Sequence, residues 1–182
     1  KKNSYLVALI LLVFFVISFL TNILGPIIPA IIQDFSLSLT MVAVLPFSFF
    51  IAYGVLSIPS GIMVEKWGGK KVTMLAFSIA FVGALVFGLY PSYGVAIFSL
   101  FLIGMGMAML QVVINPLLRE AGGEENLAFF SVLGQFFFGL ASFLSPLVYS
   151  YLVLSIEREE KTNWLFSTLR RLVPENLPWV SL

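Results

Sequence analysis

The sequence predicts an all-α, polytopic membrane helical bundle, and three observations support that class. Of the 182 residues, 60% are hydrophobic and only 10% are charged, whereas a soluble domain has about 25% charged residues. The mean hydropathy is +1.05. Short charged segments separate long apolar runs, and about 20 apolar residues are enough to cross a bilayer. These runs are too apolar for a soluble fold and too continuous for the alternating strands of a barrel.

Five apolar runs define the expected membrane spans. Charged side chains are absent from 5–33, 35–64, 72–118 and 126–156. The third of these runs is twice the length of one span, and Tyr90-Pro91-Ser92-Tyr93 interrupts it with a turn signal and interfacial aromatic residues. We therefore expect helices over about 5–31, 40–64, 71–90, 93–118 and 127–155.

The C-terminal part of the chain differs from the spans. Residues 156–178 begin as a polar loop, and apolar residues recur at helical spacing from Trp164 to Val173. That spacing fits an amphipathic helix on the membrane surface, and a solvated loop fits it equally well. Residues 179–182 look like the start of a truncated sixth helix. Because the chain opens with Lys1-Lys2, we expect it to be part of a longer protein.

Basic residues alternate between the loops and predict an orientation. The N-terminus has two, 32–39 none, 65–71 three, the turn at 91 none, and 119–126 one. Short loops rich in lysine and arginine are retained on the cytoplasmic side of the membrane. We therefore expect the N-terminus to be cytoplasmic, in a multi-pass protein of the bacterial inner (plasma) membrane, with the lipid bilayer as its surroundings.

Four uncharged amides lie inside the spans: Asn22, Gln111, Asn115 and Gln135. Each would cost free energy in hydrocarbon, so each is expected to face protein or water. Gln111 and Asn115 are four residues apart and share a helix face. Paired amide donors and acceptors suit substrate hydroxyl groups. The structural alternative is hydrogen bonding between helices, at about 0.6 kcal/mol per bond.

Prolines and glycines predict where the helices bend and approach one another. Gly25-Pro26 follows Asn22, and Asn115-Pro116 follows Gln111, so each amide precedes a proline that removes a helical hydrogen bond. Interrupted helices at the substrate site are typical of transporters built from three-helix repeats. Small residues in the third and fourth spans predict close helix packing, and the glycines among them are Gly83, Gly88, Gly104 and Gly106.

Catalytic sets are absent from the sequence. It has no cysteine and no histidine, and Glu65, Glu120, Glu124 and Glu125 lie in loops. There is no acid–histidine pair, phosphate loop or metal-ligand cluster. We therefore expect no enzyme activity, no cofactor and no metal, and the net charge of +1 gives no sign of a nucleic-acid partner.

The loop between the second and third spans has a specific pattern, Gly61-x-x-x-Glu65-Lys66-x-Gly68-x-Lys70-Lys71. This pattern resembles the signature between helices 2 and 3 of the major facilitator superfamily, G-x-x-x-D-[RK]-x-G-x-[RK]-[RK], with Glu in place of Asp. The resemblance implies the N-terminal six-helix domain of a transporter without its sixth helix. A C-terminal half would complete the transporter.

A finer resemblance runs through most of residues 5–155. Three segments resemble the fucose–galactose–glucose:proton symporter branch: Thr21-Asn22-Ile23-Leu24; Gly104-x-Gly106 with Gln111-x-x-x-Asn115-Pro116; and Asn126-Leu127-Ala128 with Gln135. The branch couples sugar to protons through an Asp in helix 1 and a Glu in helix 4. Asn22 and Gln111 occupy those positions here, and an amide does not exchange a proton at physiological pH.

The resemblance implies a secondary active transporter that moves a monosaccharide by alternating access. The expected substrate contacts are Asn22, Gln111, Asn115 and Gln135, with Tyr53 and Phe136 as aromatic contacts. Coupling would use sodium, use protons through the missing half, or be absent.

The expected cytoplasmic gating motif comprises Gly61, Glu65, Lys66, Gly68, Lys70, Lys71 and Arg119. Within it, Glu65 would face a helix N-terminus of the missing half or pair with Arg119. Two alternative functions stay open, an exporter of apolar compounds, supported by Phe136-Phe137-Phe138, and a non-transporting membrane scaffold or sensor.

Overall fold

The computed structural model describes residues 4–23, 25–26, 28–29, 32, 36–90 and 92–157, with side chains as far as 152. Its elements are α1 (Ser4–Asn22), α3 (Leu39–Trp67), α4 (Gly69–Leu89), α5 (Tyr93–Gly122), the short 3-10 helix η1 (Glu124–Asn126) and α6 (Leu127–Glu157).

Five of the described helices are long and apolar enough to cross a membrane, and no strand occurs in the described ranges. This confirms the predicted all-α class and an integral, multi-pass membrane protein. The described residues end at 157. The rest of the 156–178 segment, with its expected amphipathic helix, and the expected start of a sixth helix at 179–182 therefore lie outside them.

The first helix ends at Asn22, whereas a span as far as residue 31 was expected. The Ile23 N–H still donates to the Phe19 carbonyl at 3.1 Å, and helical backbone recurs at 25–26 and 28–29. Pro26 has no N–H to donate to the preceding turn, which accounts for an interruption after Asn22.

Caps define the other helix ends. The Ser38 and Ser92 hydroxyls accept N–H groups from the first turns of α3 and α5, each at 3.4 Å. Gly68 and Gly123 end α3 and α5 with φ of +80°, a conformation that side chains disfavour. The two glycines allow the chain to reverse within one or two residues at the same end of the bundle.

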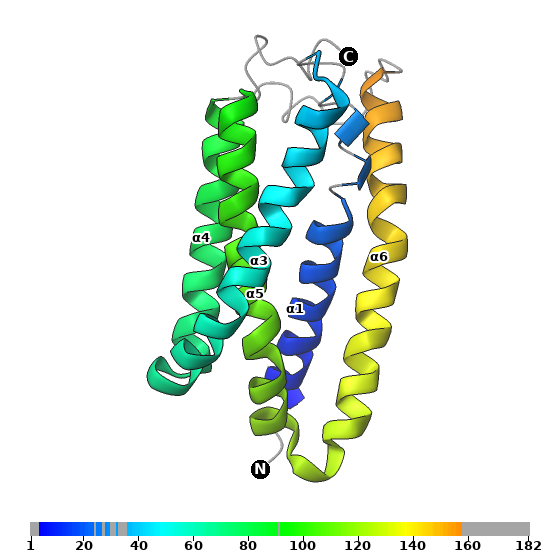
Figure 1. Cartoon of the computed structure of the whole chain (residues 1–182). Helices are drawn as coiled ribbons and strands as arrows, with labels where there is room; N and C mark the ends of the chain where they lie inside the picture. The colour runs from blue at the N-terminus through cyan, green and yellow to red at the C-terminus, as the bar shows by residue number, and fades with distance from the viewer. Residues whose placement is uncertain are drawn as a thin grey trace.

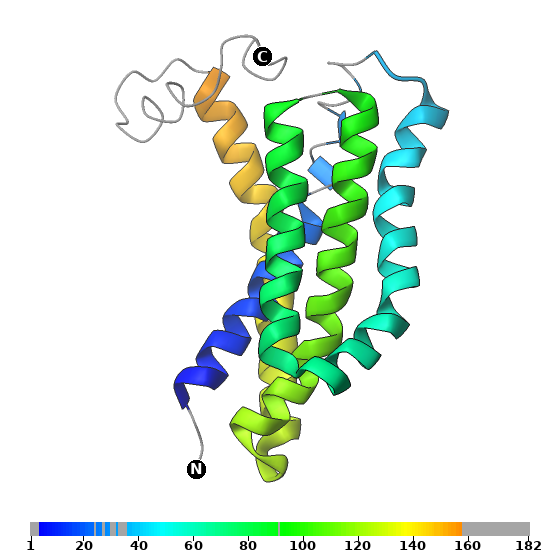
Figure 2. The ribbon, with the colours of Figure 1, turned by 90° about the vertical axis from the view of Figure 1, so that its left-hand side faces the viewer.

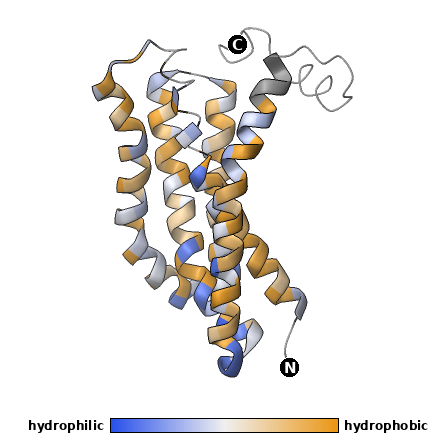
Figure 3. Ribbon diagram, turned by 90° about the vertical axis from the view of Figure 1, so that its right-hand side faces the viewer, coloured by the Kyte–Doolittle hydropathy of each residue, from blue (hydrophilic) through white to orange (hydrophobic). Residues whose placement is uncertain are grey.

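Successive helices run in opposite directions, so the start of α1, the α3–α4 junction and the α5–α6 junction lie at one end (Figure 1). Hydrophilic residues gather at that end (Figure 3). The α5 helix is central and contacts α1, α3, α4 and α6, most extensively α3 and α4. The α6 helix packs mainly on α1, which it crosses at an angle (Figure 2).

Glycines let α5 approach its two main neighbours backbone to backbone. A Cβ atom at Gly104 would overlap the Phe49 carbonyl oxygen of α3. A Cβ at Gly106 would lie 2.6 Å from a carbonyl oxygen of α4, and one at Gly83 would lie 2.9 Å from a carbonyl oxygen of α5. The predicted close approach is therefore present at these three positions. Gly88 has no described atom within 4 Å of such a Cβ, so it packs against none of the described helices.

Candidate functional site

One face of α5 carries a stripe of polar side chains. Gln111, Asn115 and Arg119 follow at four-residue intervals, which places them on a common face. Gln111 is half-buried, and Asn115 and Arg119 are exposed. The opposite side of α5 at this depth is buried, as Met109 and Val113 show. The sequence folds this way because the apolar residues of α5 have four neighbouring helices to pack on, while the polar stripe is left open.

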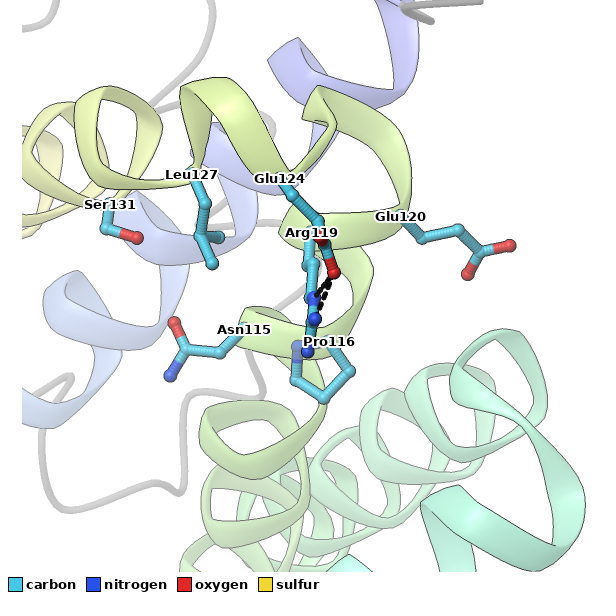
Figure 4. A pocket seen from close by; sticks show the side chains of 7 residues that line it. All are labelled: Asn115, Pro116, Arg119, Glu120, Glu124, Leu127 and Ser131. Atoms are coloured by element: carbon cyan, nitrogen blue, oxygen red, sulfur yellow. Dashed lines mark hydrogen bonds and ion pairs between the residues drawn. The ribbon is translucent and has the colours of Figure 1, made fainter.

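An open pocket of about 690 Å³ lies beside this stripe, between α5 and the start of α6. Figure 4 shows Asn115 and Ser131 on the same side of the pocket, whereas Glu120 points away from them. The lining combines two uncharged polar residues, an ion pair, a further glutamate and two apolar residues: Asn115, Pro116, Arg119, Glu120, Glu124, Leu127 and Ser131.

The register of the α5–α6 hairpin extends this arrangement by one helical turn. Residues equally far from the junction at Gly123 lie at similar depth, which pairs Asn115 with Ser131, as the pocket lining bears out. The next such pair is Gln111 with Gln135, four residues or about 6 Å deeper into the bundle. Gln135 is exposed. The pocket contains the first of these pairs, whereas Gln111 and Gln135 line no described pocket.

Asn22 lies at the C-terminal end of α1 and belongs to a different contact. Its amide nitrogen donates to the Ser18 carbonyl at 2.8 Å and approaches the Ser18 hydroxyl oxygen at 3.3 Å. Ser18 is fully buried, and its hydroxyl donates to the Phe138 carbonyl of α6 at 2.6 Å. Asn22 is thus held by its own helix, and through Ser18 by α6.

Contacts along the α1–α6 seam show how far Asn22 lies from the other amides. A Cβ at Gly134 would touch the Phe14 ring, and Ser18 bonds Phe138, so over this stretch the two helices run in the same direction with residue numbers offset by 120. Gln135 is then level with position 15 of α1, and Asn22 is seven residues farther, about 10 Å along the axis. Of the six predicted substrate contacts, only Asn115 lines a described pocket.

The two aromatic candidates have different surroundings. Tyr53 of α3 is half-buried against the core and stacks on Phe49, with ring centroids 6.3 Å apart. Phe136 of α6 is 63% exposed and meets Phe137 edge to face. Neither ring lines a described pocket, so the contact of Tyr53 and Phe136 with a substrate stays a prediction.

All the gating-motif residues except Arg119 lie at the α3–α4 junction. Gly68 caps α3 and donates its N–H to the Val64 carbonyl at 2.9 Å, with the positive φ that explains a glycine there. Glu65, Lys66, Lys70 and Lys71 are exposed. A Cβ at Gly61 would meet no described atom within 4 Å, so a close helix partner for this glycine is not among the described residues.

Arg119 pairs with Glu124 of η1, not with Glu65 as one hypothesis had it. Its guanidinium donates to the Glu124 carboxylate from two nitrogens, one of them Nε at 2.9 Å. The two residues are five apart and are brought together by the tight turn at Gly123, so the local pair forms without a distant partner. Within the described residues this is the one ion pair.

Sequence reasoning missed Ser131, Ser18 and Ser145. Each is a small residue in an apolar run, and serine in a membrane helix normally bonds to its own backbone. A signal for Ser131 was present, since it is four residues from Gln135 and mirrors Asn115 about Gly123. The cross-helix bonds of Ser18 to Phe138 and of Ser145 to Phe19 required the packing of α1 on α6.

A family model described as Major Facilitator Superfamily matches residues 10–168. The chain belongs to this superfamily. It is 28% identical over 90% of its length to a "Glucose/galactose transporter" of Brucella abortus, and 29% identical over its whole length to a "Putative glucose/galactose transporter" of Helicobacter pylori. It is 25% identical over 85% of its length to an "L-fucose-proton symporter" of Escherichia coli.

The chain spans less than half of the length of these curated relatives, 40%, 46% and 36% respectively. No solved structure matches it. The names agree with the sugar-symporter branch that the sequence resembles, and they make a sugar transporter the function to consider.

Proposed function

We propose that this superfamily member takes part in moving a monosaccharide across the membrane by alternating access. The observation that carries the proposal is the open pocket where Asn115 of α5 and Ser131 of α6 offer neutral hydrogen-bonding groups, in a chain whose relatives are named for glucose, galactose and fucose. Neutral amides and hydroxyls can each donate and accept, as can the hydroxyl groups of a sugar.

The proposed substrate contacts are Asn22, Gln111, Asn115 and Gln135, with Tyr53 and Phe136 as aromatic surfaces. Asn115 of α5 lines an open pocket rather than a packed interface, which favours binding over simple adhesion between helices. Asn22 lies about 10 Å farther along the bundle, so we propose that it contacts the sugar at a different depth.

The proposed transport does not use proton exchange at Asn22 or Gln111. An amide has no proton to give up near neutral pH, so neither side chain can change charge between the two access states. Coupling to sodium, coupling through other parts of the protein, and uncoupled transport each fit this proposal.

The end that carries the α3–α4 and α5–α6 junctions is proposed to be cytoplasmic, because three lysines and Arg119 lie there. Glu65, Lys66, Lys70 and Lys71 would contact the other half of the transporter when the cytoplasmic entrance closes. Their exposure in this chain leaves them available for that contact.

A ligand-dependent thermal-shift screen of the full-length protein tests the proposal. Galactose, glucose and fucose are compared with apolar amphiphiles, in the wild type and in Asn115→Ala. We expect at least one sugar to raise the melting temperature, with an apparent affinity about three- to tenfold weaker in the variant, the usual effect of one lost hydrogen bond.

The control is Ser78→Ala of α4, which removes an exposed hydroxyl bonded to the Met74 carbonyl at 2.9 Å, away from the pocket. Its sugar affinity should match that of the wild type. Stabilisation by apolar compounds and by no sugar would contradict the proposal and favour an exporter.

A further inference from the structure

The seam between α1 and α6 carries two serine-to-backbone hydrogen bonds that helix packing alone does not require. Ser18 of α1 donates to the Phe138 carbonyl of α6 at 2.6 Å, and Ser145 of α6 donates to the Phe19 carbonyl of α1 at 2.9 Å. Both serines are fully buried. Other described serines of the spans, such as Ser60 and Ser78, bond to the preceding turn of their own helix.

The two bonds differ in what lies next to them. The Ser18 hydroxyl gives its single proton to Phe138, so the oxygen faces Asn22 as an acceptor, 3.3 Å from the amide nitrogen. The Ser18 carbonyl accepts from the same nitrogen at 2.8 Å. Ser145 has no described bond to Asn22.

This geometry decides how the Asn22 amide is oriented. A carbonyl oxygen only accepts, so the atom that faces it is the amide nitrogen and not the oxygen. The nitrogen has two hydrogens, and Ser18 supplies an acceptor for each. The nitrogen therefore has no hydrogen left to offer, and the amide oxygen is the group that remains for a ligand.

We infer that Ser18 is a positioning residue that makes Asn22 a hydrogen-bond acceptor toward substrate and ties its orientation to the position of α6. The inference rests on the proposed function, in which Asn22 contacts the sugar. It specifies that contact: Asn22 requires a hydroxyl that donates. A fluorine in place of this sugar hydroxyl accepts a hydrogen bond only weakly and cannot donate one, so it cannot make the contact.

The test measures uptake by the full-length protein in proteoliposomes, for the preferred sugar and for its monodeoxy and monofluoro analogues. At one carbon of the sugar, the wild type should have a KM about tenfold higher for the deoxy and the fluoro analogue than for the parent sugar. In Ser18→Ala one amide hydrogen is released, so the KM for the parent sugar should rise about fivefold and the discrimination at that carbon should shrink.

Ser145→Ala is the matched control, because it also removes one buried bond across the same seam but leaves Asn22 untouched. A purely structural role for Ser18 predicts equal effects of the two variants on KM and on discrimination, and that outcome would overturn the inference. Unchanged discrimination in Ser18→Ala would overturn it as well.

A second measurement separates this inference from the proposed function. Melting temperatures are compared for Ser18→Ala, Asn22→Ala and the double variant, without any sugar. Coupled side chains give non-additive shifts, so we expect non-additivity for Ser18 with Asn22 and additivity for Ser145 with Asn22. Additive shifts in both pairs would refute the contact. A wild type that transports no monosaccharide would instead refute the proposed function.

Discussion

At the scale of single residues, glycine positions are the most direct test of the packing. Gly104→Ala places a Cβ against the backbone of α3, where no side chain can move aside. We expect a loss of about 1–3 kcal/mol in stability, the usual cost of overpacking. The melting temperature of the full-length protein in detergent measures it.

Gly88→Ala is the control for that prediction, since its Cβ meets no described atom within 4 Å. Alanine also favours the helix by up to about 1 kcal/mol over glycine. A Gly104→Ala variant as stable as Gly88→Ala would show that α5 does not approach α3 as the structure has it.

Ser99 provides a residue-scale prediction of the opposite sign. Its hydroxyl is buried and has no hydrogen-bond partner among the described residues. Ser99→Ala should therefore raise stability by about 1 kcal/mol, because a buried hydroxyl without a partner is costly. Ser48→Ala removes a buried hydroxyl that bonds to the Leu45 carbonyl at 2.8 Å and should lower stability. Equal melting shifts for the two variants would contradict this prediction.

The amides themselves show how far sequence reasoning reaches at this scale. Burial cost predicts that Asn22, Gln111, Asn115 and Gln135 avoid lipid, without specifying which side chain or cavity each one meets. That depends on helix register and crossing, which set Ser131 opposite Asn115 and bond Ser18, the neighbour of Asn22 in α1, to Phe138 of α6. Neither serine has a sequence signal as strong as that of the amide it accompanies.

At the scale of elements, the helices follow from apolar length, and their junctions follow from glycine. Continuous apolar runs predicted five spans because a bilayer requires about 20 residues. Hydropathy did not predict the end of α1 at Asn22, because the apolar run continues through Pro26, and only Gly25-Pro26 indicated a bend there. Periodicity cannot reveal such a break, whereas the missing proline N–H can.

The α3–α4 junction separates two roles of the motif glycines. Gly68 has φ +80° and ψ 153°, a conformation nearly exclusive to glycine, so Gly68→Ala should cost about 1–3 kcal/mol. Gly61→Ala should leave stability within about 0.5 kcal/mol, since no described atom is near. Thermal unfolding compares the two, and a larger loss at Gly61 would show that another helix packs closely against it.

The ion pair across the α5–α6 junction is expected to act on transport rather than on stability. Arg119 and Glu124 are 61% and 72% exposed, and exposed pairs contribute about 0–1 kcal/mol. Glu124→Gln should therefore leave the melting temperature almost unchanged. If Glu124→Gln changes uptake and the exchanged pair, Arg119→Glu with Glu124→Arg, restores it, the ion pair belongs to the cytoplasmic gate. If Glu124→Gln leaves uptake unchanged, Arg119 does not belong to the gate.

At the scale of the whole molecule, α5 is the centre of the bundle, and the candidate site lies on a face of α5 that the described helices leave open near the α5–α6 junction. The superfamily could be predicted from the loop motif, because glycine and charge at a helix junction are encoded locally. The depth at which each amide would meet a substrate could not be predicted, because it depends on how the helices cross. The spread of about 10 Å between Asn22 and Gln135 is a property of the assembled α1–α6 pair.

The measurement that tests the central claim most directly is counterflow of labelled monosaccharides by the full-length protein in proteoliposomes, with and without a pH gradient. We expect exchange of at least one of galactose, glucose and fucose, weakened in Asn115→Ala and Gln111→Ala. Accumulation should not be driven by a pH gradient through Asn22 or Gln111, since neither titrates. Absence of exchange for all three sugars, or gradient-driven accumulation that Asn22→Ala or Gln111→Ala abolishes, would contradict the proposed function.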